Sequence, residues 1–311
     1  MTATHRRRRG RGEQPVVPEA TFASYYGTPV LNRPTWKALD IAGYLFLGGL
    51  AGASSLLAAG AEATARPALA RVAKLGAAGA VSASLGLLVH DLGRPSRFLN
   101  MLRVCKPTSP MSVGSWLLAG YAPLTLTAAA TDVAGRFRLV GRAAALSAAV
   151  LGPVVTTYTA VLIADTAVPS WHDAHRELPF VFAGSGATAA AGLALVGAPA
   201  GQTGPARRMA VLGAALEVGA FRLMRRRMGL TAEPYERGLL RAAEALTASG
   251  AALAGLRGGR APGAVAGAAL LAGSAALRFG VFHAGVASAQ DPKYTVVPQR
   301  ERLAARAREG T

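Results

Sequence analysis

The chain has 311 residues, of which 51% are hydrophobic and only 16% are charged, and its mean hydropathy is positive. A soluble domain carries about 25% charged residues, and a soluble helical bundle needs regularly spaced charges on its outer faces. The composition therefore excludes both. The formal net charge is +18, but the basic residues lie between apolar runs rather than on a soluble face, so we predict contact with lipid headgroups and no nucleic acid partner.

Residues 1–36 are basic and lack the apolar run of a secretory signal peptide. They are predicted to form a flexible tail followed by a pre-helix segment. Tyr26, Asn32 and Trp36 lie in this segment, just before the first apolar run. Aromatic residues in such a place are either interfacial anchors or part of a site at the membrane surface.

Eight apolar runs of about twenty residues follow, the length that a helix needs to cross a hydrocarbon core roughly 30 Å thick. The predicted spans are 37–60, 70–90, 112–131, 139–163, 178–198, 206–223, 238–256 and 263–288. We expect an all-α integral membrane fold of two four-helix bundles, at 37–163 and 178–288, joined by a polar loop at 164–177. A basic tail at 289–311 completes the chain.

Eight spans place both termini on the same side of the membrane. About two thirds of the 34 Lys and Arg residues lie on that side, which the positive-inside rule assigns to the cytoplasm. Selection of these charges by a protein partner, rather than by lipid, is an alternative explanation of the same bias.

The most distinctive polar segment joins the second and third runs and contains His90, Asp91, Arg94 and Arg97. A charge near hydrocarbon costs several kcal/mol unless it has a partner or a task. Asp91 and Arg94 are therefore either a structural ion pair or part of a functional site.

Other polar residues are predicted at the same membrane face, among them Tyr158, Asp165, His172 and His283. Together they could hydrogen-bond the carbonyls of a ring ligand and relay its protons. Taken singly, the histidines have simpler explanations. The pair His172 and His175 lacks a third ligand, so no metal site is predicted, and the few histidines near spans disfavour a bis-histidine haem.

Four ionisable residues lie inside or at the edges of the later spans: Glu217, Arg241, Glu244 and Arg278. They form either a pathway for protons or a set of charges that neutralise one another in weakly hydrophobic helices. The sequence favours neither interpretation.

Several segments together resemble the NrfD/polysulfide-reductase membrane-subunit family. They are His90-Asp-Leu-Gly-Arg-Pro95, Thr108-Ser-Pro-Met-Ser112 with Trp116, Tyr26-Gly-Thr-Pro, and Asp291-Pro-Lys-Tyr-Thr-Val-Val-Pro-Gln. The resemblance extends over nearly the whole chain.

This resemblance implies an integral subunit of a multi-subunit respiratory oxidoreductase in the cell inner or plasma membrane. Such a subunit binds menaquinone or ubiquinone near one membrane face and holds no haem or iron–sulfur cluster itself. Its partners are a ferredoxin-like iron–sulfur subunit and, beyond it, a molybdopterin-type catalytic subunit.

Carried over, the motif makes His90, Asp91 and Arg94 candidates for quinone contact and proton transfer, with Tyr26, Asn32, Trp36 and Arg97 beside them. In well-known members the quinone pocket faces outward, whereas the charge count here predicts the cytoplasmic side. Two other functions stay open. One is a purely structural anchor, and the other is a secondary transporter, which would place polar groups near the membrane midplane.

Overall fold

The computed structural model describes residues 30–309 except 33, 95, 237 and 257. All regular structure in this part of the chain is helical. The longer helices are α1 (Ala38–Ala63), α2 (Pro67–Asp91), α4 (Pro110–Ala134), α5 (Arg138–Ala164), α7 (Leu178–Gly197), α8 (Gly204–Met228), α9 (Gly238–Gly255), α10 (Arg260–Gln290) and α11 (Lys293–Glu309). The short ones are α3 (Arg97–Met101), α6 (Pro169–Asp173), η2 (Ala200–Gln202) and η3 (Gly229–Glu236).

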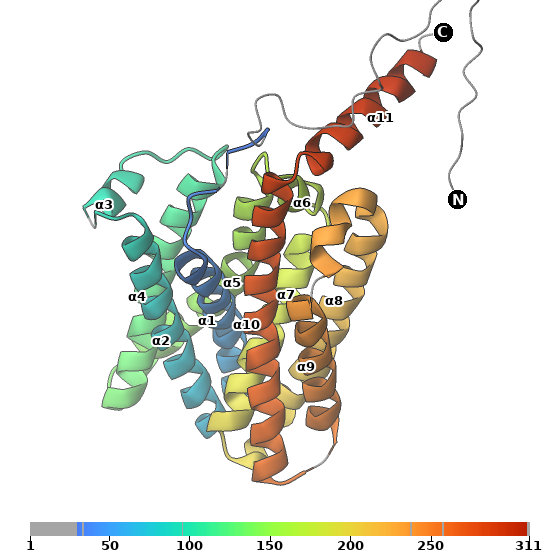
Figure 1. The fold of residues 1–311 in the computed structure, drawn as a ribbon. Helices are drawn as coiled ribbons and strands as arrows, with labels where there is room; N and C mark the ends of the chain where they lie inside the picture. The colour runs from blue at the N-terminus through green and yellow to red at the C-terminus, as the bar shows by residue number, and fades with distance from the viewer. Residues whose placement is uncertain (1–29, 33, 95, 237, 257, 310–311) are drawn as a thin grey trace, which may run out of the picture.

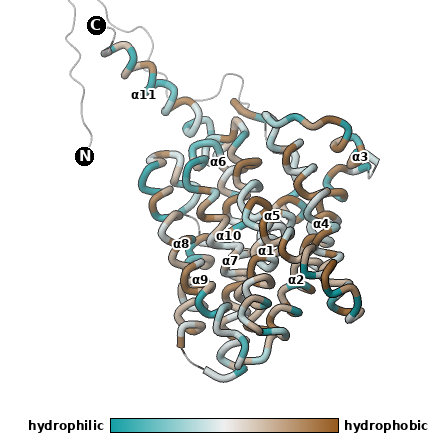
Figure 2. The backbone as a smooth tube through the Cα atoms, turned by 180° about the vertical axis from the view of Figure 1, so that it is seen from behind, coloured by the Kyte–Doolittle hydropathy of each residue, from teal (hydrophilic) through white to brown (hydrophobic). Residues whose placement is uncertain are grey.

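Among the described residues, six helices are long and apolar enough to cross a membrane: α1, α2, α4, α5, α7 and α10. Hydrophobic residues are spread along these helices, and hydrophilic ones gather at the ends (Figure 2). The predicted all-α membrane fold is therefore confirmed, and the protein is a multi-pass membrane protein. The predicted sixth and seventh spans form helices α8 and α9, but both fall outside this set, so the number of eight spans stays a prediction.

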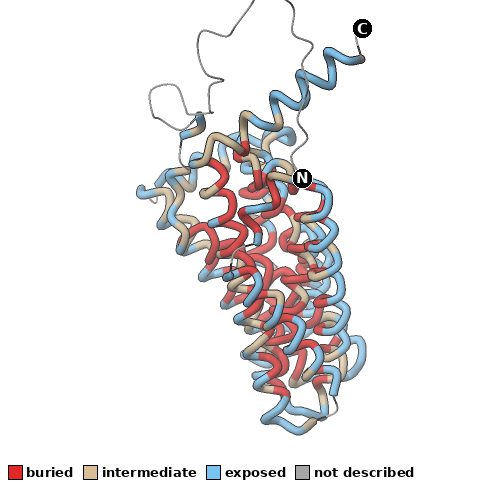
Figure 3. The backbone as a smooth tube through the Cα atoms, turned by 45° about the vertical axis from the view of Figure 1, so that its right-hand side comes forward, coloured by how far each residue is buried: buried red, intermediate tan, exposed pale blue. Residues whose placement is uncertain are grey.

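The long helices pack as two neighbouring groups (Figure 1). In the first, α1 packs on α2 and α5, and α4 packs on α5; in the second, α7 packs on α8 and α10, and α9 packs on α10. Helix α1 also packs on α7 and α10 and so joins the groups. The buried residues follow this central contact along the length of the body (Figure 3).

Three interfaces depend on glycines that face each other. Gly52 of α1 meets Gly152 of α5, so that a Cβ on either glycine would overlap the other's carbonyl oxygen. The same reciprocal contact joins α7 to α8 and α7 to α10, through the pairs Gly184–Gly213 and Gly192–Gly267. Close backbone approach is what holds helices together in lipid, where no hydrophobic driving force acts between them.

Helices α3, α6 and the start of α11 lie at one end of the body, which we call the α3/α6 end (Figure 1). The basic C-terminal tail is largely the helix α11, which extends away from the body and is mostly exposed (Figure 3). At its base, Lys293 Nζ lies 2.6 Å from Glu233 Oε2, and the Tyr294 hydroxyl donates to the same oxygen at 3.1 Å. The hydrogen bond from Lys293 lowers the pKa of the Glu233 carboxyl.

An ion pair ties the end of α8 to the start of α7. Arg227 donates from Nε and Nη2 to the two carboxylate oxygens of Glu177, both at 2.6 Å. Glu177 is buried, and this hydrogen bond lowers the pKa of its carboxyl. Its folded-state pKa therefore lies below the ordinary 4.5, so the pair stabilises the fold above that pH and the stabilisation is lost as the pH falls.

We expect Glu177→Gln to lower the free energy of unfolding by about 1–3 kcal/mol at pH 7, because Arg227 loses a bidentate, charge-assisted partner. At pH 4 the difference from the wild type should shrink. Thermal unfolding of the detergent-solubilised chain at both pH values measures this, with the exposed Glu236→Gln as a control. A difference that is the same at pH 7 and pH 4 would contradict the assignment.

Candidate functional site

A cavity of about 130 Å³ lies among α1, α2, α4 and α5, close to the α3/α6 end. Its wall is mostly apolar. The lining residues are Trp36, Ile41, Tyr44, Leu45, Leu88, Asp91, Leu92, Met101, Met111, Gly114, Ser115, Leu118, Tyr158, Leu162 and Ile163. Three of the residues predicted as site candidates, Trp36, Asp91 and Tyr158, therefore meet in this one cavity.

Tyr158 supplies a polar group that the protein itself leaves unused. Its side chain is buried, and its hydroxyl has no hydrogen-bond partner among the described residues. Gly114 of α4 makes room for it, because a Cβ at that position would overlap the Tyr158 ring. A buried hydroxyl without a partner costs about 1–3 kcal/mol. Since such groups are rare in folded proteins, the Tyr158 hydroxyl is suited to bind a ligand.

Asp91 lines the cavity from the last residue of α2. Its Oδ1 accepts a hydrogen bond from the backbone N–H of Lys37 at 3.4 Å. The chain then turns at Gly93, whose φ of 69° is a conformation that favours glycine. Among the described residues, Asp91 forms no ion pair with Arg94. The predicted structural ion pair therefore does not close this loop.

His90 does not line the cavity but pairs with Asp40, a residue that the sequence reasoning missed. His90 Nδ1 lies 2.9 Å from Asp40 Oδ2 and 3.0 Å from Oδ1. Asp40 is buried in the first turn of α1, whereas the His90 side chain is 66% exposed. The pair therefore links a buried carboxylate to solvent beside the cavity. The sequence could have identified Asp40, because it is a carboxylate inside the predicted first span and needs a partner there.

Trp36 is held in the cavity wall by a stacking contact with helix α6. Its ring stacks on that of Trp171, with centroids 5.9 Å apart and an interplanar angle of 21°. Trp171, from α6, is fully buried, and its Nε1 donates to the carbonyl of Val281 in α10 at 2.8 Å. Trp171 is therefore a core residue between the two groups of helices rather than an interfacial anchor.

The segment Thr108–Trp116 fastens the loop that follows α3. Ser112 Oγ accepts from the backbone N–H of Lys106 at 3.0 Å and donates to the carbonyl of Val104 at 2.9 Å. Trp116 Nε1 donates to the same carbonyl at 3.3 Å. Because Met111 of this segment lines the cavity, the motif fixes one of its walls.

The remaining surface candidates do not reach the cavity. His172 Nδ1 lies 3.2 Å from the Ala164 carbonyl, and His283 Nδ1 lies 2.7 Å from the Phe279 carbonyl on its own helix. Six of the predicted residues are exposed and absent from the cavity lining: Asn32, Arg94, Arg97, Asp165, His172 and His283. Tyr26 lies outside the described residues.

The four ionisable residues of the later helices are separated into two environments. Glu217 and Arg278 are buried in the second group of helices. Glu217 accepts hydrogen bonds from Thr188 at 3.2 Å and Thr247 at 2.9 Å, and Arg278 donates to the Phe182 carbonyl at 3.0 Å.

Glu244, in contrast, is neutralised by Arg222 and Arg225, whose guanidinium nitrogens lie 2.7 Å and 3.3 Å from its oxygens. Arg241 is exposed. The structure thus places two of these residues in the buried interior and two at the surface, one of them in an ion-pair cluster, where the sequence suggested one set. In the described part of the chain, no three His, Cys, Asp or Glu side chains gather as a metal site would require.

The family described as "Polysulphide reductase, NrfD" matches residues 30–203, which is more than half of the chain. The match contains every residue that lines the cavity and both members of the His90–Asp40 pair. It ends before α8, so Glu217 and Arg278 lie outside it. No curated protein matches the chain.

Proposed function

Because the chain belongs to the polysulphide reductase NrfD family, whose members are membrane subunits of quinone-linked oxidoreductases, we propose that it binds quinone or quinol and exchanges electrons with an iron–sulfur partner subunit. The observation that carries the proposal is an apolar cavity lined by a tyrosine whose buried hydroxyl has no partner among the described residues. The apolar wall and the hydroxyl without a partner suit the quinone ring of menaquinone or ubiquinone.

The size and chemistry of the cavity support this ligand. Apolar cavities of about 150 Å³ hold a single benzene-sized ring, and the volume here is about 130 Å³. Aliphatic side chains and Trp36 would contact the faces of the ring. The Tyr158 hydroxyl would donate to one carbonyl oxygen, and ligand sites of this kind use a few such polar groups in an apolar wall to fix orientation.

When bound, a quinone supplies the two-electron, two-proton redox chemistry, and the chain supplies position and a proton path. Asp91 is the acid–base group in the cavity wall. Lys37 touches two carboxylates, because its backbone N–H binds Asp91 and its ammonium lies 4.0 Å from Asp40. Asp40 in turn binds His90, which is exposed to solvent. We propose that Asp91 exchanges protons with solvent beside the His90–Asp40 pair, and that Lys37 holds the two carboxylates next to each other.

The electron-transfer partner would dock at the α3/α6 end, because the cavity lies nearest to that end. The loop between α2 and α4 is exposed there and carries Arg94, Arg97, Arg103 and Lys106. An iron–sulfur subunit with an acidic face would complement these charges, and a molybdopterin-type subunit would bind beyond it. We further propose that this end and both termini are cytoplasmic, as the charge distribution predicts.

Quinone titration of the purified full-length chain in nanodiscs tests the binding directly. A quinone ring next to Trp36 should quench tryptophan fluorescence in a saturable way, and the chain has only three Trp residues. Trp36→Phe should reduce the saturable quenching and leave the part that comes from the stacked Trp171, whereas Trp116→Phe, which changes an exposed residue outside the cavity, should retain it. Quenching that never saturates would instead support a structural anchor without a quinone site.

A further inference from the structure

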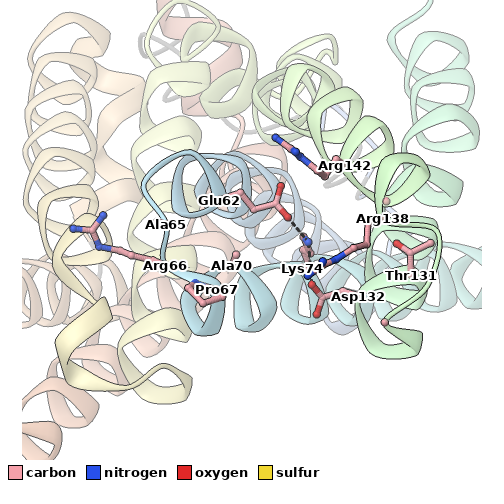
Figure 4. Close-up of a pocket in the computed structure, with 12 residues that line it drawn as sticks. Glu62, Ala65, Arg66, Pro67, Ala70, Lys74, Thr131, Asp132, Arg138 and Arg142 are labelled. Atoms are coloured by element: carbon pink, nitrogen blue, oxygen red, sulfur yellow. Dashed lines mark hydrogen bonds and ion pairs between the residues drawn. The ribbon is translucent and has the colours of Figure 1, made fainter.

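A second and larger cavity, of about 580 Å³, opens at the end of the body opposite the α3/α6 end. It is formed where α1 meets α2 and α4 meets α5, so it is far from the candidate quinone site along every one of these helices. Cavities of roughly 300–1,000 Å³ are the usual size of small-molecule sites. Figure 4 shows the charged side chains around it.

The floor of this cavity is a cluster of ion pairs in which the acidic side chains are neutralised by basic ones. Lys74 of α2 is buried and pairs with Glu62 of α1 and with Asp132 of α4, the latter at 3.0 Å. Asp132 also lies 3.6 Å from Arg71. Both acidic side chains of the lining are thus occupied by cations, and neither is available to neutralise the arginines around the cavity.

Two of these arginines, Arg138 and Arg142, come from the first turns of α5. Neither guanidinium forms an ion pair or hydrogen bond with any described residue. They stand four residues apart on one helix face, where like charges repel. Arg138 is also the first residue of α5, in a first turn with no acidic residue, where the helix dipole disfavours a cation. Figure 4 shows Arg138 extending toward Lys74, whereas Arg66 extends to the opposite side.

Beyond Lys74 the helices close. Ala58, Ala77, Ala128, Ala145 and Ala148 pack there and leave a space of only about 10 Å³. A ligand that entered the cavity would therefore stop at the level of Lys74 and keep its outer part at the membrane surface.

From this geometry we propose that the cavity binds a phosphate-bearing anion between Arg138 and Arg142, either a phospholipid headgroup or free phosphate. Four basic and two acidic side chains line the cavity, so its net charge is positive. The planar guanidinium matches phosphate oxygens with two parallel hydrogen bonds, and basic pockets between membrane helices are known to bind lipid headgroups. An anion at this position would remove the repulsion between the two arginines and tie α5 to α1 and α2.

Binding of phosphatidylglycerol to the full-length chain, measured by native mass spectrometry in neutral detergent, tests the proposal. The wild type should retain phosphatidylglycerol in preference to phosphatidylcholine. The double variant Arg138→Gln/Arg142→Gln should bind it roughly tenfold more weakly or worse, because each arginine contributes charge-assisted hydrogen bonds. The matched control is Arg136→Gln, which removes the same charge from an exposed residue outside the cavity.

A second titration, with inorganic phosphate and thermal unfolding as the readout, separates the two sources of the anion. The site would be assigned to free phosphate by two results together. Phosphate would stabilise the wild type but not the double variant, and the wild type would not retain phosphatidylglycerol selectively. Arg138→Lys/Arg142→Lys keeps the charge and should bind more weakly than the wild type but better than the glutamine variant. Equal binding of both anions by the wild type, the double variant and Arg136→Gln would overturn the proposal. None of these readouts involves quinone.

Discussion

Replacing Tyr158 by Phe is expected to weaken quinone binding and to lower quinone-linked turnover of the assembled complex by roughly tenfold to a hundredfold. The proposed hydrogen bond to the quinone carbonyl forms in an apolar, buried site, where a single bond of this kind contributes most. Binding titration and steady-state kinetics with a soluble quinol analogue measure the two effects.

The same substitution separates ligand binding from folding. The Tyr158 hydroxyl has no partner within the protein, so its removal should leave the free energy of unfolding unchanged or slightly raise it. Tyr121→Phe is the matched control, because the Tyr121 hydroxyl is hydrogen-bonded to Ser55 at 2.6 Å and lies outside the cavity lining. This control should lose stability and retain quinone binding. Unchanged binding in Tyr158→Phe would remove the tyrosine from the site.

The membrane helices could be predicted from the sequence because the part of each helix that contacts lipid is a long run of mainly apolar residues. The predicted span 139–163 differs from α5 by one residue at each end, and the predicted span 178–198 from α7 by one residue at its end. The error is larger for α8, which continues to Met228 beyond the predicted limit of 223. Arginines such as Arg225 and Arg227 end the apolar run, yet they are good helix formers.

The candidate site was only partly predictable, since sequence neighbours identify a loop but not what packs against it. The motif identifies Asp91 as a site candidate. Trp36 is identified by its position just before the first span. Tyr158 was suggested by topology alone, and its position depends on Gly114 in another helix. His172 and His283 had the same topological support, but helix rotation turns both to the surface. When hydrophobic residues surround a helix, its composition does not show which side faces the neighbouring helices. The rotation of the helix about its axis therefore cannot be predicted from the sequence.

The buried ion pairs were the least predictable feature. Lys74 belongs to the second apolar run, where the sequence shows its positive charge but not its partners. Its partners Glu62 and Asp132 come from two other helices, 12 and 58 residues away, and only the packing of α1, α2 and α4 brings the three together. A charge inside an apolar run indicates that a partner exists, but it does not identify that partner.

Asp91→Asn is expected to lower quinone-linked turnover by roughly a hundredfold or more while the complex still assembles. The asparagine Oδ1 keeps the acceptor for the Lys37 N–H, so the turn after α2 should persist, but the amide cannot take up or release a proton. Assembly is measured by co-purification of the partner subunits, and turnover by quinol oxidation. Asp165→Asn is the matched control, because it makes the same change at an exposed residue between α5 and α6, outside the cavity lining.

Asp91→Ala distinguishes the chemical role of this carboxylate from its structural one. Alanine removes both the acid–base group and the acceptor for Lys37, so this variant should lose stability by about 1 kcal/mol as well as activity. If Asp91 only held the turn, Asp91→Asn would turn over like the wild type and Asp91→Ala alone would be impaired. If Asp91 carries protons, both variants should be inactive to a similar degree, and only Asp91→Ala should unfold at a lower temperature. The ordering of the two variants therefore decides between a structural and a proton-transfer role, without depending on the size of either effect.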